Sequence, residues 1–294
     1  MFENKILNGK KLAEDLNLKL KQEIQELVKQ TSINPKLAVI IVGEDPAIEV
    51  YVRNKRRVCG EIGIEFETFE LPTNSTKEEV IKTIEKLNKD ETIHGFLLQM
   101  PIPPHLKNHI PEFVEIIDPK KDVDGFNPLN KGYLFDYREE LIPCTPQGII
   151  ALLEHYDIKI QGKDIVIVNR SNLVGKPLIF MLLKRNATVT ICHTLTKNIE
   201  DHMKRADILV VAVGIPKFVK KKHIKEGAII IDVGMSRVQG KLCGDVDFDD
   251  VIEKCSWITP SPGGIGPLTV YFLLHNTILA YKKTIKSSNS SNNK

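Results

Sequence analysis

The sequence contains no long hydrophobic run. Its longest uninterrupted apolar stretches, such as 37–42 and 208–213, are six residues long, whereas a membrane-spanning helix needs about 20. We therefore expect no membrane segment and no membrane partner. The first five residues show neither the apolar core of a signal peptide nor an arginine- and serine-rich transit pattern, so we expect a cytoplasmic protein.

An excess of one charge and a cysteine framework are lacking too. Lys and Arg together number 41 and Asp and Glu 38, a net charge of +3 that is too balanced to indicate nucleic-acid binding. The five cysteines are scattered and form no Cys-x-x-Cys motif, which argues against disulfides and zinc and favours buried free thiols. With 42% hydrophobic residues in 294, the chain has enough apolar surface for about two folded domains.

The first half alternates short apolar runs with amphipathic stretches, which indicates β-α-β-α-β and a parallel sheet covered by helices. Asn8 is a candidate N-cap for the first helix, and Ser75 with Glu78 matches a capping box. We expect strands near 37–42, 64–69 and 93–100, and helices near 12–27, 46–60 and 77–87.

The second half repeats this pattern, so the chain is predicted to be an α/β protein of two domains. We expect strands at 164–169, 188–193, 208–214 and 228–232, and helices at 145–155, 174–185 and 267–281. The domain boundary is placed near 143–145. The Ser/Asn-rich end, 284–294, is expected to be a disordered tail.

The segment from Val166 to Pro177 is predicted to be a strand, a loop and a helix start, the arrangement in which a helix N-terminus attracts phosphate. The G-x-G-x-x-G fingerprint is absent, because Asn169 stands where its first glycine would be. A nucleotide site and an ordinary loop therefore both remain open. Arg170 and Lys197, together with the lack of an acid after the next strand, favour NADP over NAD.

Two loops have unusual compositions. Thr259–Pro267 contains three glycines and three prolines in nine residues, which suits close approach of a rigid backbone to a flat ligand. The other loop carries Asp122 and Asp124, which can bind Mg²⁺, hydrogen-bond an amino-heterocycle or simply shape a turn. Because no third acidic ligand follows at metal spacing, we predict no metal.

Tyr51 and Lys55 lie four residues apart on a predicted helix and therefore share one face. A lysine beside apolar surface can lose its proton and act as a general base. Alternatively, Lys55 belongs with Arg53, Arg56 and Arg57 to a solvated basic face. Short-chain dehydrogenases also use Tyr-x-x-x-Lys, but with a glycine-rich turn before the pair; that order is reversed here.

Together these segments resemble the bifunctional methylenetetrahydrofolate dehydrogenase/methenyltetrahydrofolate cyclohydrolase (FolD) family. The resemblance extends from Tyr51 to Asn276, and the joint order and spacing of its motifs are specific. The motifs are Tyr51 with Lys55, Gly95–Pro103, Lys121–Phe126, Pro143–Pro146, Asn169–Pro177, Gly244–Val246 and Pro262–Pro267.

The resemblance implies two domains flanking a cleft, in a homodimer. The implied N-terminal αβα catalytic domain, 1–144, binds folate and receives the last helix, 267–283. The implied C-terminal domain, 145–266, is Rossmann-like and binds NADP. The implied activity is oxidation of 5,10-methylenetetrahydrofolate with NADP, followed by hydrolysis of 5,10-methenyltetrahydrofolate to 10-formyltetrahydrofolate.

The resemblance also implies roles for individual residues. Lys55 is the implied catalytic lysine, tuned by Gln99, while Tyr51 stacks on the aminobenzoyl ring and Asp124 holds the pterin amino edge. The implied folate pocket further includes Leu98, Met100, Pro262, Gly263, Gly264, Ile265 and Gly266. The implied NADP contacts are Asn169, Arg170, Ser171, Thr194, Gly214 and Met235.

The chain departs from the common family pattern at Asn169 for Gly, Thr194 for Ser or Arg, and Ser261 for Val. We expect Asn169 to preserve the turn because Asn tolerates left-handed backbone better than most residues. The alternatives are a dehydrogenase without cyclohydrolase activity, a non-catalytic nucleotide-binding or dimerisation module, and another Rossmann enzyme. The last would need a carboxylate-binding Arg and a catalytic His, which the sequence does not offer.

Overall fold

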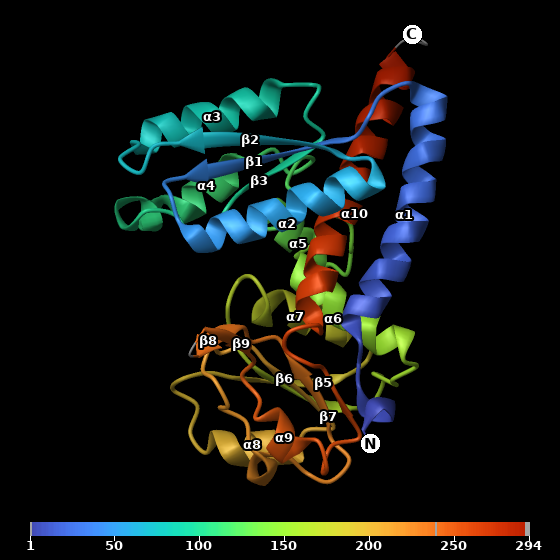
Figure 1. Ribbon diagram of the computed structural model, residues 1–294, viewed down its shortest axis with the longest axis vertical. Coiled ribbons are helices and arrows are strands. Elements are labelled where there is room, and N and C mark those ends of the chain that lie inside the picture. Colours follow the sequence, from blue (N-terminus) through green and yellow to red (C-terminus); the bar gives the residue numbers. More distant parts are fainter. Residues whose placement is uncertain (1, 239, 292–294) are drawn as a thin grey trace. The chain divides into compact units, whose positions relative to one another are not determined.

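The computed structural model describes residues 2–238 and 240–291 and divides into two compact units, each described by itself (Figure 1). The first, here the sheet-of-three unit, comprises Asp15–Ile142 and the chain from Val270 onward. The second, the sheet-of-five unit, comprises the chain up to Glu14 together with Pro143–Thr269. None of the described helices combines the length and apolar character that a membrane-spanning segment requires.

The sheet-of-three unit is built on parallel strands in the order β2-β1-β3. Its strands are β1 (Lys36–Val42), β2 (Glu65–Leu71) and β3 (Gly95–Leu98). Its helices are α2 (Pro46–Ile62), α3 (Lys77–Lys89), η2 (Pro104–His109), α4 (Ile110–Ile116), α5 (Pro128–Phe135) and most of α1 (Gly9–Thr31) and α10 (Ile265–Ser291). The predicted α/β pattern of the first half is confirmed.

Helices cover the sheet, which explains why β1 is apolar at nearly every position. On one face, alternate residues Ala38, Ile40 and Val42 pack with α3 and α4 in a buried cluster that includes Phe96 and Phe113. Figure 1 shows α2 along the sheet on the side away from α3. The chain passes from β1 to β2 on one side of β1 and then crosses to the other side to form β3. The direction in which strands are added to the sheet therefore reverses between β1 and β3.

The capping box of α3 lies one residue later than the sequence suggested. Thr76, not Ser75, is the N-cap: its Oγ1 accepts from the Glu79 backbone N–H at 3.3 Å, and Glu79 Oε2 accepts from the Thr76 N–H at 2.8 Å. Ser75 and Thr76 are adjacent, as are Glu78 and Glu79, so the sequence pattern fits a capping box of Ser75 with Glu78 as well as one of Thr76 with Glu79. The predicted cap at Asn8 is confirmed, since its Oδ1 accepts from the Lys11 N–H at 3.0 Å.

Helix α10 lies beside α1 within the sheet-of-three unit (Figure 1). The Tyr281 hydroxyl donates to the Ile33 carbonyl at 2.7 Å, and Lys282 pairs with Glu23. The sequence predicts a helix end near Tyr281 and a disordered tail over 284–294, but α10 continues to Ser291. No glycine or proline follows Pro267 to stop it. Residues 292–294 lie outside the described residues.

The sheet-of-five unit has parallel strands in the order β10-β7-β6-β4-β5, the open twisted arrangement of Rossmann-like domains. Its strands are β4 (Asp164–Val168), β5 (Thr188–Cys192), β6 (Ile208–Val211), β7 (Ile229–Asp232) and β10 (Trp257–Ile258). Its helices are η1 (Glu3–Lys5), α6 (Cys144–His155), α7 (Gly175–Lys184), α8 (Ile199–Arg205), η3 (Lys221–His223) and α9 (Phe248–Val251). The strand order reverses between β4 and β6.

Three short strands of this unit were not predicted: β8 (Ser236–Val238), β9 (Lys241–Cys243) and β10. They are two or three residues long, too short for an alternating pattern to show. β8 and β9 form an antiparallel pair, with Gly240 at φ +79° just before β9. The prediction of buried free thiols is confirmed for four of the cysteines, whereas Cys243 is partly exposed.

Candidate active site

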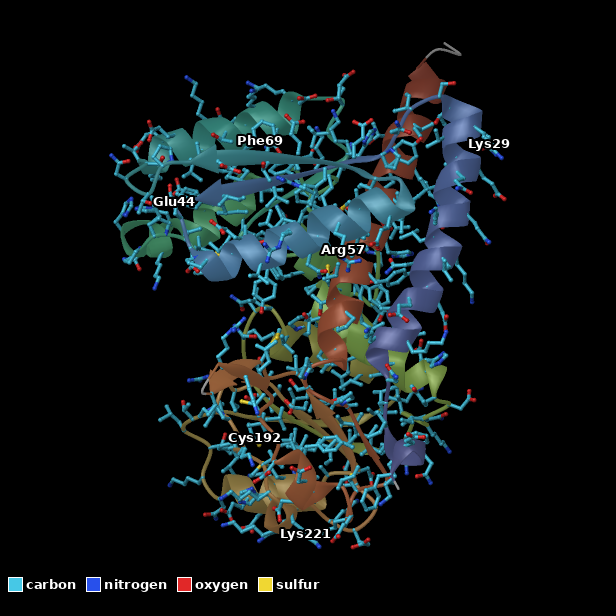
Figure 2. The ribbon with its side chains drawn as sticks, in the orientation of Figure 1. Lys29, Glu44, Arg57, Phe69, Cys192 and Lys221 are labelled. Atoms are coloured by element: carbon cyan, nitrogen blue, oxygen red, sulfur yellow. The ribbon has the colours of Figure 1, made fainter. Side chains whose placement is uncertain are left out.

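Lys55 lies on the buried face of α2 rather than on its solvated face. Counting back and forward by three or four residues gives Ile48, Val52, Cys59 and Ile62, all of which are buried. Lys55 itself is only partly exposed, whereas Arg53, Arg56 and Arg57 are exposed. Arg57, labelled on α2 in Figure 2, pairs with Glu61 and Asn54. The solvated basic face therefore consists of the arginines and excludes Lys55.

The side-chain nitrogen of Lys55, Nζ, donates a hydrogen bond to Gln99 Oε1 at 2.8 Å. Gln99 follows directly on β3, at the carboxyl end where the strand order reverses, and is 8% exposed. Its Nε2 donates to the Met100 carbonyl at 2.7 Å, and its backbone N–H donates to the Ile40 carbonyl at 2.8 Å. These bonds fix the amide so that its oxygen faces Lys55.

Asp122 and Asp124 do different work in the loop after α4. Asp122 is 2% exposed, and its carboxylate accepts from the backbone N–H groups of Gly125 and Asn127 and from the Asn130 side chain, at 2.8–3.1 Å. The alternative in which the acids of this loop shape a turn is therefore right for Asp122. By holding the turn, Asp122 positions the backbone of Asp124 beside it.

Burial raises the pKa of both acids of this loop. Burial raises the pKa of Asp124 to about 6, with the Lys55 charge lowering it and the Asp122 charge raising it. The effect of the Lys55 charge on the Asp124 pKa shows that the two side chains interact electrostatically. Tyr51, one turn before Lys55 on α2, is 46% exposed. The structure thus brings Lys55, Gln99 and Asp124 together, whereas the side chains of Leu98 and Met100 pack in the buried cluster with α3 and α4.

Asn169 is the anchor of the β4–α7 loop, in the sheet-of-five unit. Its Oδ1 accepts from the backbone N–H groups of Ser171 at 2.8 Å and Gly175 at 3.0 Å. Its Nδ2 donates to the Ala212 carbonyl, just after β6, at 2.6 Å, which ties together the two strand ends where the order reverses. We expected Asn169 to preserve the turn by adopting left-handed backbone, and this reason is wrong. Asn169 does not have a positive φ, and it holds the turn through its side chain.

The loop and the N-terminus of α7 suit a nucleotide phosphate. Gly175 leaves no room for a Cβ, which would lie 2.2 Å from the Asn169 carbonyl oxygen, so the loop packs tightly on the helix. Ser171 Oγ accepts from the Val174 N–H at 3.1 Å, while Arg170 and Thr194 are exposed at the carboxyl ends of β4 and β5. No acidic side chain occurs in 193–197 to repel a 2′-phosphate.

The other predicted residues of this unit lie on loops that follow β6, β7 and β10, except Ile265 and Gly266, which are the first two residues of α10. Gly214 has φ +68°, and Met235 is 42% exposed. The Pro262–Gly266 loop rests on the start of α1: the Lys10 N–H donates to the Gly263 carbonyl at 2.9 Å, and a Cβ on Gly9 would lie 1.9 Å from the Gly264 carbonyl oxygen. No sequence pattern indicates that the N-terminal residues support this loop.

The sequence offered no role for two buried acids, Asp232 and Asp245, although Asp245 lies in the Gly244–Val246 motif. A signal was present for Asp232, since it is a charged residue at the end of the otherwise apolar strand Ile229–Asp232. Among the described residues, no group of three or more His, Cys, Asp or Glu side chains is placed to hold a metal ion.

Comparison with known proteins matches both units to one family. Residues 7–124 match the tetrahydrofolate dehydrogenase/cyclohydrolase catalytic domain, and residues 143–285 match the NAD(P)-binding domain of that family. The bifunctional protein FolD of Listeria innocua is 50% identical over 282 residues, covering 96% of this chain and 98% of the relative.

Solved structures give the same result. The bifunctional FolD dehydrogenase/cyclohydrolase of Campylobacter jejuni is 43% identical with a TM-score of 0.91, covering 95% of this chain and 98% of the other. The FolD enzyme of Trypanosoma brucei, solved with NADP cofactor and inhibitor, is 34% identical with a TM-score of 0.90, covering 95% and 98%. This chain belongs to the tetrahydrofolate dehydrogenase/cyclohydrolase family.

Proposed function

We propose that this chain catalyses both reactions of its family at one folate site. It oxidises 5,10-methylenetetrahydrofolate to 5,10-methenyltetrahydrofolate with NADP, and then hydrolyses the product to 10-formyltetrahydrofolate. The observation that carries the proposal is the 2.8 Å hydrogen bond between Lys55 and Gln99, in the range matched by the family's catalytic domain. A dehydrogenase alone has no evident need for this proton-transfer group.

The oxidation depends on positioning. The methylene carbon lies between two nitrogens, whose lone pairs help to expel hydride, so no strong base is required. In this proposal Tyr51 stacks on the aminobenzoyl ring and Asp124 accepts hydrogen bonds from the pterin amino edge. Leu98 and Met100, whose side chains pack in the buried cluster with α3 and α4, contribute backbone to the pocket. When bound, NADP supplies the nicotinamide ring that accepts the hydride.

The hydrolysis requires proton transfer. The oxygen of water bonds to the amidinium carbon of the methenyl group while a proton passes to the neutral amine of Lys55. The bond between that carbon and N5 then opens: its electron pair goes to N5, which takes up a proton, and the added hydroxyl group loses its proton to become the carbonyl oxygen of the 10-formyl group. The proton received by Lys55 is the one released overall. Gln99 keeps the Lys55 nitrogen directed at the reacting carbon through the oxygen that its own bond to Met100 orients.

The residues of the β4–α7 loop support NADP as the nucleotide. Arg170 is exposed in the loop just after β4 and offers a bidentate partner for a 2′-phosphate, and Ser171 and Thr194 add hydroxyl groups. Asn169 holds this loop, Gly214 and Met235 belong to neighbouring loops, and Pro262–Gly266 contributes backbone to the nicotinamide and folate. We assign folate binding to the sheet-of-three unit and NADP binding to the sheet-of-five unit.

The proposal includes a homodimer in the cytoplasm, and no metal in either reaction. The assembly is tested by light scattering of the purified protein, which should give about twice the mass of one chain.

Two assays of the wild-type protein test the activity. The first mixes it with 5,10-methylenetetrahydrofolate and follows reduction of NADP and, separately, of NAD. The second starts from methenyltetrahydrofolate without nucleotide and follows its enzyme-dependent loss. Turnover in both assays, with NADP preferred, is the expected result. Nucleotide reduction without methenyl loss would leave only the dehydrogenase and remove the role of Lys55.

A further inference from the structure

Two buried carboxylates lie beneath the loops of the sheet-of-five unit, and the proposed chemistry uses neither. Asp232 ends β7 and is 4% exposed; Asp245 follows β9 and is 0% exposed. Lone buried carboxylates are costly, so each needs hydrogen-bond donors around it. The donors here are almost all backbone N–H groups of the surrounding loops.

Asp232 uses both of its carboxylate oxygens as acceptors. Oδ1 accepts from the N–H groups of Gly234 and Asp245, and Oδ2 accepts from that of Val246, each at 3.0 Å. Burial raises the pKa of Asp232 to about 6, and the Asp245 charge adds to the rise, while these backbone donors lower it. The donors therefore offset part of the cost of keeping the group ionised.

Asp245 uses one oxygen. Its Oδ2 accepts from the N–H groups of Val213 at 2.6 Å and Gly214 at 3.0 Å, both on the loop after β6. Its Oδ1 is buried and has no hydrogen-bond partner in the part of the chain that the structure describes. One residue thus fixes two consecutive amides of the loop that carries Gly214.

The two acids interlock through two glycines. A Cβ on Gly234 would lie 2.0 Å from the Asp245 carboxyl carbon, and a Cβ on Gly244 would lie 1.9 Å from Asp232 Oδ2. Each carboxylate therefore occupies the space that a side chain would need on the other segment. A 2.9 Å hydrogen bond from Ser261 Oγ to the Gly234 carbonyl adds the Pro-Gly loop to this network.

We infer that Asp232 and Asp245 are positioning residues for the cofactor, holding the loops of Gly214, Met235 and Pro262 in the conformation that binds the nicotinamide end of NADP. This inference rests on the proposed function. The geometry joins three loops that approach the carboxyl ends of β6, β7 and β10, and no other charged side chain hydrogen-bonds the loop amides of residues 213–214 and 234 among the described residues. Neither acid touches the reacting atoms.

Asp232 accepts hydrogen bonds with both carboxylate oxygens, whereas Asp245 accepts with one. We therefore expect NADPH binding to respond differently when each Asp is replaced by Asn. Asp245→Asn keeps a single oxygen that can accept from Val213 and Gly214, so it preserves the network. Asp232→Asn replaces one of two working acceptors with an NH₂ group that faces a backbone N–H donor. Asp245→Ala removes the acceptor altogether and leaves two amides unsatisfied.

The test measures binding of NADPH by fluorescence titration, and separately the loss of methenyltetrahydrofolate without nucleotide. Asp245→Ala and Asp232→Asn should each raise the Kd for NADPH by about tenfold or more, as expected for lost bonds to a buried charge. Asp245→Asn should stay within about threefold of wild type. The nucleotide-free cyclohydrolase rate should remain close to wild type in the two Asp245 variants, because the bonds that Asp245 accepts come only from the loop of Val213 and Gly214, which is not assigned to folate.

Asp207→Asn is the matched control. Asp207 precedes β6 at the opposite, amino end of the sheet, where it accepts from the Asp164 N–H at 2.9 Å and pairs with Lys225 at 2.5 Å. This variant should lose thermal stability without a change in the Kd for NADPH. If Asp232→Asn does not fold, the comparison of Asp245→Ala with Asp245→Asn decides the matter alone.

Two results would overturn the inference: NADPH binding by Asp245→Ala that equals wild type, or a loss of cyclohydrolase rate in proportion to the loss of NADPH affinity, which would mean a general collapse. The proposed function fails differently. A wild-type protein that binds NADPH but oxidises no methylenetetrahydrofolate would refute the dehydrogenase, while the same titrations would still decide the role of the two acids.

Discussion

Lys55 donates a hydrogen bond to Gln99 Oε1 across 2.8 Å, from the buried face of α2 to the end of β3. The two residues are 44 positions apart in the chain, and the parallel pairing of β1 with β3 brings them together. Because the Gln99 amide is itself held by the Met100 carbonyl, the pair is a fixed element rather than a chance contact.

Gln99→Glu should impair hydrolysis more than oxidation. A carboxylate beside the ammonium would hold the proton on Lys55, and the group could then no longer accept one from water at neutral pH. We expect a fall of about 10²-fold in the cyclohydrolase rate, the usual size of a lost general base, with a smaller fall in NADP reduction. Gln25→Glu, the same change on the exposed face of α1, is the control and should alter neither rate.

The dependence of folate binding on pH should follow Asp124, whose pKa is raised to about 6. The ionised carboxylate accepts from the pterin, so kcat/KM for methylenetetrahydrofolate should fall as the pH drops below about 6. Asp124→Asn should lower kcat/KM by about 10- to 100-fold, the size of a hydrogen bond to a charged group, and abolish this acidic limb. A limb that persisted unchanged in Asp124→Asn would assign it to another group; Asp136→Asn, at an exposed position, is the control.

The raised pKa of Asp124 also makes the stability of the fold depend on pH in a defined direction. Its pKa is about 6 in the folded protein against an ordinary 3.8, so the folded state binds the proton more tightly. The free energy of unfolding should therefore decrease through this group as the pH rises from 3.8 to about 6, and then level off. Urea titrations of wild type and Asp124→Asn across this range should differ in slope; parallel curves would contradict the shift.

Asn169→Ala should weaken cofactor use selectively. The substitution removes two acceptor bonds within the β4–α7 loop and the 2.6 Å bond to Ala212. We expect the KM for NADP to rise by about tenfold, with the nucleotide-free cyclohydrolase rate unchanged. Asn172→Ala, in the same loop, removes only an exposed bond to Lys176 and should leave the KM near wild type. Equal effects of the two variants would contradict the anchoring role.

The register of the α3 cap can be tested by stability alone. Thr76→Ala should lower the free energy of unfolding by about 1 kcal/mol, the usual value of an N-cap, without a change in either activity. Ser75→Ala should cost less, because Ser75 Oγ has no hydrogen-bond partner among the described residues. Denaturant melts of the two variants check this, and the reverse order of the two effects would restore the register that the sequence first suggested.

Much of the fold could be predicted because its periods are clear. Runs such as 37–42 and 208–211 are buried on both faces and therefore apolar throughout, and the amphipathic stretches between them match the helices. Short elements escaped because two or three residues carry no period, as β8, β9 and β10 show. The extent of α10 was underestimated because a polar composition does not by itself end a helix that nothing interrupts.

The site was predictable where single side chains have distinctive chemistry, and less so where backbone carries the function. Tyr51 with Lys55 stands out by spacing, and Lys55 by its place in an otherwise apolar stripe. The anchoring of Asn169, the separation of Asp122 from Asp124, and the interlocked acids Asp232 and Asp245 depend on which N–H groups the fold turns toward each carboxylate or amide. Such pairings are decided by tertiary structure.

The most direct test of the central claim compares wild type with Lys55→Met in both assays. Methionine matches the length of the lysine stem without its amine, so the buried face of α2 should remain packed. The account predicts that enzyme-dependent loss of methenyltetrahydrofolate falls by about 10²-fold or more in a folded variant that still binds NADPH. Full cyclohydrolase activity in that folded variant would contradict the account.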